Sequence, residues 1–140
     1  MIPGRCEMDS NEIKEVIKVY LDGCYEADSG AMAYVFHDAA HIYASGEDGA
    51  LIEWDKDAFV ELVDGQDGGA VAGWPRYDEI VSLDFTGANS AVARVKVRIA
   101  DVIYSDILCF MRLDGKWKVI SKVFEGVPAI LPDDFLNRID

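Results

Sequence analysis

The sequence predicts an α+β fold, a strongly curved and mostly antiparallel sheet wrapped over three N-terminal helices. Apolar residues recur at helical spacing over residues 13–25, whereas residues 77–124 alternate between apolar and polar side chains. Short turn sequences containing Asp and Gly separate the alternating runs. Helices followed by consecutive strands indicate segregated layers, with the helices on one face of an antiparallel sheet.

Length and composition indicate a single domain. The chain has 140 residues and 51% hydrophobic content, which suits one core. We expect one domain over residues 1–140, with a core of about 10–126 and a C-terminal tail of 127–140. No apolar run reaches the roughly 20 residues of a membrane span, and the first residues lack the basic and apolar parts of a signal peptide. We therefore expect a cytoplasmic protein that binds no membrane.

The charge distribution disfavours nucleic acid as a partner. The net charge is -13, and phosphate binding needs clustered Lys and Arg. Residues 94–122 nevertheless hold seven basic and three acidic residues, a local charge of +4. This segment is either a solvated or interfacial sheet face or a landing surface for an anion.

Neither a metal site nor a bound cofactor is expected. The three cysteines are widely spaced and have no nearby His pairs, so we expect reduced thiols at Cys6, Cys24 and Cys109. The chain contains no glycine-rich phosphate loop after a strand, no HExxH and no GxSxG.

Three helices are expected in the N-terminal half. Asp9 and Glu12 form a capping-box-like start for the first. Ser29 can cap a short second helix, and Asp55 a third. Between the last two, residues 41–45 and 51–54 flank a Gly-Glu-Asp-Gly turn and indicate a hairpin.

A glycine-rich segment, residues 65–73, precedes Trp74. Two interpretations stay open. The segment is either a flexible lid tipped by Trp74 over a pocket or a loop whose one aromatic side chain docks on the core.

Four long strands complete the expected sheet. Residues 77–85 and 90–99 alternate across a Thr-Gly-Ala-Asn turn, and the second of these strands has one apolar and one basic face. Residues 102–112 and 117–124 flank Leu113-Asp114-Gly115-Lys116, and Asp-Gly between such runs predicts a tight hairpin.

Three sequence stretches resemble the nuclear transport factor 2-like superfamily, and within it the SnoaL-like group known as putative lumazine-binding. They are YLDG at 20–23, FHDAA at 36–40 and LDGKWKVISKVF at 113–124. The resemblance covers about residues 10–126. It implies a cone-shaped pocket between sheet and helices. For this pocket we expect a small apolar or aromatic ligand.

The resemblance also implies which residues line that pocket. Ketosteroid isomerases of the superfamily use a helix-one tyrosine, a first-hairpin carboxylate as base and a carboxylic acid one strand before the last. The matching register places Tyr20 at the tyrosine, Ala44 at the base and Cys109 at the acid. Both proton-handling groups are missing, so isomerase chemistry by that route is not supported. Trp54 and Trp74 are the expected aromatic walls.

Three further residues are catalytic candidates. His37, just after the second helix, either hydrogen-bonds backbone at a helix end or acts as a base, and the same alternatives apply to His41. Asp106 lies mid-strand among apolar residues, where it is either paired with Lys122 or Arg98 or a functional carboxylate. The chain is accordingly a small-molecule-binding module, a lyase or isomerase using the same pocket, or a non-catalytic interaction domain.

The strand at 102–112 is apolar on both faces, which predicts an assembly. If the helices cover the concave side, an apolar patch of five side chains stays on the convex side: Tyr104, Leu108, Phe110, Ile120 and Phe124. Such a patch usually marks an interface. We expect a homodimer through the convex face, which Leu108→Asp or Phe110→Asp splits into monomers.

Overall fold

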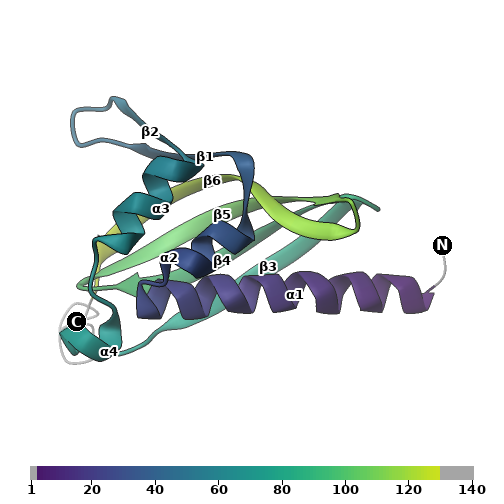
Figure 1. Ribbon diagram of the computed structural model, residues 1–140, viewed down its shortest axis with the longest axis horizontal. Helices are drawn as coiled ribbons and strands as arrows, with labels where there is room; N and C mark the ends of the chain where they lie inside the picture. Colours follow the sequence, from purple (N-terminus) through teal and green to yellow (C-terminus); the bar gives the residue numbers. More distant parts are fainter. Residues whose placement is uncertain (1–2, 130–140) are drawn as a thin grey trace, which may run out of the picture.

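The computed structural model describes residues 3–129, whose six strands form one curved sheet with helices on one side (Figure 1). The side chain of Cys6 and the tail from residue 130 lie outside this description. The elements are α1 Pro3–Glu26, α2 Ser29–Val35, β1 Phe36–Ser45, β2 Leu51–Asp55, α3 Lys56–Asp64, α4 Gly69–Ala72, β3 Asp78–Gly87, β4 Ser90–Ile99, β5 Val102–Leu113 and β6 Lys116–Pro128. The predicted α+β class is confirmed.

The sheet order is β2-β1-β6-β5-β4-β3. Every neighbouring pair is antiparallel except β1 and β6, which run parallel. The β1–β2 hairpin projects from one end of the molecule (Figure 1). None of the helices in the described part is both long and apolar enough to cross a membrane.

The core lies between the helices and the sheet face that they cover, here called the inner face. The opposite face is called the outer face. Strand β4 turns its apolar residues inward (Ala91, Ala93, Val95 and Val97), and all four belong to the core with Ile13 and Ile17 of α1. Arg94 and Lys96 of β4 point to the outer face and are exposed. The predicted apolar and basic faces of this strand are confirmed.

Helix α1 begins at Pro3 rather than at Asp9. Proline suits the first helical position, because the N–H that it lacks would have no partner there. The apolar stripe that starts at Ile13 marks only the part of the helix that packs on the sheet. The capping-box interpretation of Asp9 and Glu12 was therefore wrong.

Aspartates cap the two shorter helices. Asp28 accepts a 3.1 Å hydrogen bond from the N–H of Ala31 and is the N-cap of α2, whereas Ser29 donates to Asp64 of α3 at 2.9 Å. The expected Ser29 cap was thus one residue out of register. The Asp55 cap of α3 is confirmed by a 2.8 Å bond from the N–H of Ala58.

The β5–β6 hairpin is confirmed. Leu113 pairs with Lys116, and Asp114 and Gly115 both have positive φ, 51° and 76°. Two consecutive positive φ values define the type I′ turn that Asp-Gly favours, since its twist matches that of the flanking strands.

A bulge in β6 sets which side chains enter the core. Cys109 pairs with Ser121, but the next residue, Phe110, pairs with Val119, so Ile120 is an extra residue. An extra residue reverses the alternation beyond it. Val119 is buried in the core before the bulge, and after it Lys122 is buried as well.

The predicted apolar patch on the convex side was wrong. Leu108 and Phe110 are completely or almost completely buried, and Tyr104 and Phe124 pack against the same core. The two faces of β5 are similarly apolar, so alternation could not decide which one the helices cover. Leu108→Asp and Phe110→Asp would therefore damage the core rather than an interface.

The glycine-rich segment docks on the end of α1. The Trp74 ring packs edge-on against Tyr25 with centroids 5.3 Å apart. Arg76 bonds to Asp22 of α1 at 2.6 Å and to Asp78 of β3 at 2.8 Å. Of the two interpretations of this segment, the docked loop fits these contacts.

Gly68→Ala should destabilise the protein by about 1–3 kcal/mol, as overpacking does. A Cβ at Gly68 would lie 2.6 Å from the backbone of Glu26, which cannot yield without moving the end of α1. Gly65→Ala is the matched control, because its Cβ would meet nothing closer than 3.7 Å. Urea denaturation of both variants gives the comparison, and equal stabilities would contradict the packing role of Gly68.

Candidate functional site

Three buried polar side chains meet under the middle of the sheet. The phenol of Tyr20 donates a 2.5 Å hydrogen bond to Asp106 Oδ2. Lys122 Nζ lies 3.9 Å from the same oxygen. The two charged side chains are only 0% and 7% exposed, so this is an ion pair inside the core. We call these three residues the buried polar cluster.

The cluster draws on three elements. Tyr20 lies on the face of α1 that packs on the sheet, and Asp106 alternates inward on β5 opposite Val95 and Phe124. Lys122 points inward only because the β6 bulge precedes it. The interpretation of Asp106 as the ion-pair mate of Lys122 is confirmed. Arg98, the other candidate mate, instead bonds to Ala100 O and lies near Asp101.

Burial raises the pKa of two side chains in this region, so both keep their protons. Desolvation, followed by the charge of Asp106, raises the pKa of Tyr20 well above its usual value of 10. Desolvation likewise raises the pKa of the Cys24 thiol to about 12. Tyr20 is therefore a neutral hydrogen-bond donor at physiological pH, and Asp106 Oδ1 has no hydrogen-bond partner among the described residues.

Aromatic rings surround the ammonium of Lys122. Nζ lies 4.7 Å from the ring centroid of Phe59, 5.0 Å from that of Phe124 and 5.3 Å from that of Tyr20. Each ring face attracts a cation, more strongly where water is excluded. These contacts offset part of the cost of burying the charge.

A cavity of about 250 Å³ adjoins the cluster on the inner face. We call it the inner cavity. Its walls are mostly apolar, and its polar lining includes Asp106 and Lys122. The lining residues are Cys24, Met32, Ala44, Ser45, Ile52, Trp54, Phe59, Leu62, Val63, Gln66, Val97, Ile99, Tyr104, Asp106, Lys122 and Phe124.

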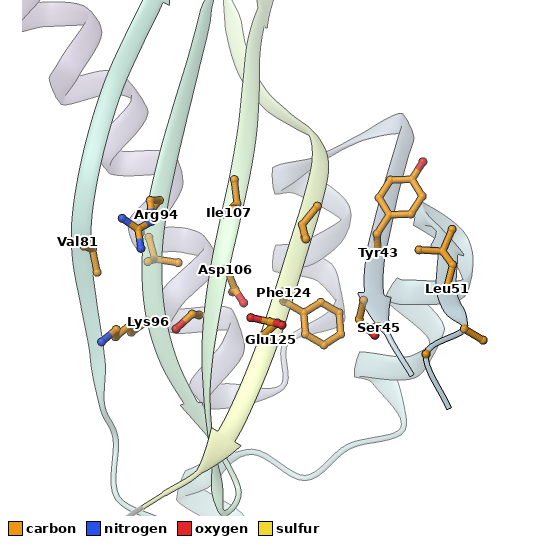
Figure 2. A pocket seen from close by; sticks show the side chains of 16 residues that line it. Tyr43, Ser45, Leu51, Val81, Arg94, Lys96, Asp106, Ile107, Phe124 and Glu125 are labelled. Carbon is orange, nitrogen blue, oxygen red and sulfur yellow. The ribbon is translucent and has the colours of Figure 1, made fainter. Parts of the chain in front are cut away.

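A second hollow of about 460 Å³ opens toward the outer face. Figure 2 shows Arg94 and Ile107 side by side on β4 and β5, with Tyr43 and Leu51 on the β1–β2 hairpin. This hollow is larger but more open to solvent than the inner cavity. The inner cavity, where buried polar groups converge, is the better candidate site.

The structure brings some of the predicted pocket residues together. Ala44 and Trp54 line the inner cavity, and Tyr20 is fully buried next to Asp106 without lining it. Trp74 does not line the cavity and packs on Tyr25 instead.

The expected position of Cys109 was wrong. Its neighbours Leu108 and Phe110 point inward, so Cys109 faces outward together with its partners Val92 and Ser121. The register counted back from Lys118 assumed regular pairing. Asp106 is the residue of β5 that meets Tyr20.

The two histidines contact backbone. His37 Nδ1 accepts a 3.0 Å hydrogen bond from the N–H of Ala39, and His41 Nδ1 lies 3.1 Å from the carbonyl of the same residue. Neither lines the inner cavity. Within the described part of the chain, no group of three or more His, Cys, Asp or Glu side chains could hold a metal ion.

Sequence reasoning missed Lys122 and Phe124 as cavity residues. It placed Phe124 in the convex apolar patch, because alternation was counted through β6 without a break. The one available signal was the charge of Lys122 in an apolar run next to a strand with an unpaired aspartate.

Asp106→Leu should cost about 3–5 kcal/mol of stability, because it leaves Lys122 buried without its counter-charge. The double variant Asp106→Leu/Lys122→Met removes both charges and should recover most of that loss. Urea denaturation of the two variants and the parent protein measures the coupling. A double variant no more stable than Asp106→Leu would contradict a buried ion pair.

The raised pKa of Tyr20 predicts loss of stability in alkali. The folded chain holds the phenolic proton more tightly than the unfolded chain, so this contribution is complete below pH 10 and is lost as the pH rises further. Tyr20→Phe should be less stable at neutral pH but should lose less stability between pH 10 and 12. Ultraviolet titration should show one of the six tyrosines ionising only on unfolding, and ionisation of all six in the folded state would contradict this.

Comparison with known proteins agrees with this geometry. The family described as "Putative lumazine-binding" matches residues 8–125. An NTF2-like protein of unknown function from Shewanella baltica is 25% identical, with a TM-score of 0.78 over 87% of this chain and 96% of that one. A similar protein from Silicibacter pomeroyi is 22% identical, with a TM-score of 0.75 over 87% and 98%. No curated protein matches the chain.

A more distant structure is a ketosteroid isomerase-like protein from Erwinia carotovora, 16% identical, with a TM-score of 0.65 over 84% of this chain and 95% of that one. At this identity the likeness concerns the fold alone. The helices on the inner face, the curved six-stranded sheet and the family match over residues 8–125 lead to one conclusion. The chain belongs to the "Putative lumazine-binding" family and has an NTF2-like fold.

Proposed function

We propose that this protein binds a small, flat, apolar or aromatic molecule in the inner cavity. The observation that carries the proposal is the buried polar cluster beside an apolar cavity with Trp54, Phe59 and Phe124 in its walls. Ligand sites combine apolar walls with a few placed polar groups. The family name points in the same direction.

The volume of the cavity limits the size of the ligand. Its volume of about 250 Å³ lies just below the usual range of ligand pockets, which begins at about 300 Å³. One ring or two fused rings fit such a space, whereas a steroid with four rings or a flavin with three is too large.

Melting temperatures measured with pterins, flavins and steroids test this proposal. A two-ring pterin should raise the melting temperature, because a ligand at 100 times its dissociation constant adds about 2.7 kcal/mol to the stability of the folded state. Trp54→Ala, which removes one wall, should reduce the shift. Val71→Ala on α4 is the control, since Val71 is exposed and does not line the cavity. The absence of a shift with every one- or two-ring compound would refute the proposal.

A second candidate function is a lyase or isomerase in the same cavity. The specific observation is that the Tyr20 phenol and the Lys122 ammonium both approach Asp106 Oδ2, at 2.5 Å and 3.9 Å. Proteins of similar fold include a ketosteroid isomerase-like one. Ala44 supplies no base at the hairpin position, so Asp106 is the remaining candidate in the cluster. Deuterium uptake from solvent next to the carbonyl of a bicyclic ketone would favour this function, provided that Asp106→Asn abolishes it.

We further propose that the protein forms a homodimer through its outer face, with a different set of residues from that expected from the sequence. Ile107 and Val123 pair across β5 and β6 and are 41% and 45% exposed. Lys96, Ser105 and Glu125 lie level with one another on β4, β5 and β6. A two-fold axis along β5 would therefore bring Lys96 of one copy over Glu125 of the other.

Ile107→Asp should convert the dimer into a monomer, because it places a charge at the centre of the apolar contact. Val71→Asp, an exposed substitution on α4, should leave the dimer intact. Lys96→Glu should weaken association, and adding Glu125→Lys should restore it. Sedimentation equilibrium at micromolar concentration measures all four, and a monomeric parent protein would overturn the proposal.

A further inference from the structure

Lys122 has hydrogen-bonding capacity that the protein does not use. Its ammonium carries three N–H donors. Within the described part of the chain it makes no hydrogen bond, and its one ion-pair contact, to Asp106 Oδ2, is 3.9 Å long. The side chain is only 7% exposed. The enclosed side-chain atoms without a partner in the described residues are Asp106 Oδ1 and Trp117 Nε1, so the Lys122 ammonium reaches accessible space and its free donors can take an acceptor from there.

That neighbouring space is the inner cavity, which Lys122 lines together with Trp54 and Phe124. Tyr20 cannot serve the cavity as a donor, because it is fully buried outside the lining and its proton is committed to Asp106. Lys122 is thus the cationic donor that the cluster offers to a molecule in the cavity.

The charge balance of the cluster restricts what that molecule can be. Asp106 neutralises Lys122, so the site as a whole has no net positive charge with which to hold a phosphate or another dense anion. A neutral carbonyl oxygen needs only a donor and carries no net charge for the nearby carboxylate to repel. The aromatic walls favour a flat ring behind that oxygen.

We propose that the inner cavity selects ring compounds that carry a carbonyl oxygen, and that Lys122 is the residue that binds this oxygen. Trp54 and Phe124 contact the ring. Asp106 faces the ammonium and holds it in position, and Tyr20, which lies outside the cavity lining, holds Asp106. This inference rests on the proposed ligand-binding function and adds the chemical class of the ligand and the selecting residue.

The test compares two ligands that differ in one oxygen. The ketone 1-tetralone and the hydrocarbon tetralin share the same two-ring frame, and calorimetry gives the affinity of each. Because a hydrogen bond to a charged group strengthens binding by about tenfold or more, the parent protein should prefer the ketone by at least that factor. Lys122→Met should reduce the affinity for the ketone to that for the hydrocarbon and leave the hydrocarbon unchanged. Lys14→Met is the matched control, because Lys14 is exposed on α1 and does not line the inner cavity.

A double variant and a vibrational measurement separate ligand recognition by Lys122 from a structural role. The double variant Asp106→Asn/Lys122→Met contains no unpaired buried charge and replaces Lys122→Met if that variant does not fold. The carbonyl stretching frequency of bound tetralone should be lower in the parent protein than in either Met variant, which a purely structural lysine would not produce.

The possible results distinguish the role of Lys122 from the ligand-binding function itself. Equal binding of ketone and hydrocarbon by the parent protein, or equal losses for both in the Met variants, would overturn the role of Lys122 and leave the cavity as a non-selective apolar site. Failure of both compounds and of every other one- or two-ring probe would overturn the proposed function itself.

Discussion

The burial of one lysine ammonium constrains the whole interior of this protein. A lone ammonium taken out of water costs several kcal/mol even after relaxation. The buried charge of Lys122 is stabilised by a carboxylate from β5 and by three aromatic rings from α1, α3 and β6. These contacts fix how the helices sit on the sheet, because displacement of α1 or α3 would remove a partner of the charge.

The bulge at Ile120 is the backbone feature that makes this arrangement possible. Without the extra residue, β6 would turn Lys122 to the outer face and Val123 into the core. A bulge breaks ladder hydrogen bonds locally, and proteins keep bulges where a side chain has to be redirected. Here the redirected side chain is that of Lys122, which lines the inner cavity. The bulge therefore places the cation of the candidate site.

The sequence predicted those features that depend on local physics. The Asp-Gly turn, the Asp55 cap and the apolar face of β4 each follow from residues within one or two turns of each other. The pairing of Asp106 with Lys122 was also predictable, since a charge in an apolar strand needs a counter-charge nearby. The orientation of β5 was not, because its two faces are similarly apolar and the bulge in its neighbour leaves no mark in the residue pattern. Cys109 was misplaced for that reason, and Phe124 because the bulge lies in its own strand.

The parallel contact between β1 and β6 has a consequence for the order of folding. Ile42 of β1 pairs with Lys122 of β6, 80 residues later in the chain, whereas β3 to β6 form a meander of hairpins that need only short loops. Closing a long loop lowers the chain entropy before stabilising contacts can form, so non-local strand pairings form late. We expect the four-stranded meander to assemble first and the N-terminal half to dock onto it as a unit, which pulsed hydrogen exchange would reveal as early protection in β4 and β5. The ammonium of Lys122 would remain hydrated until that docking step, so the desolvation of a single charge would coincide with the commitment of the chain to its native state.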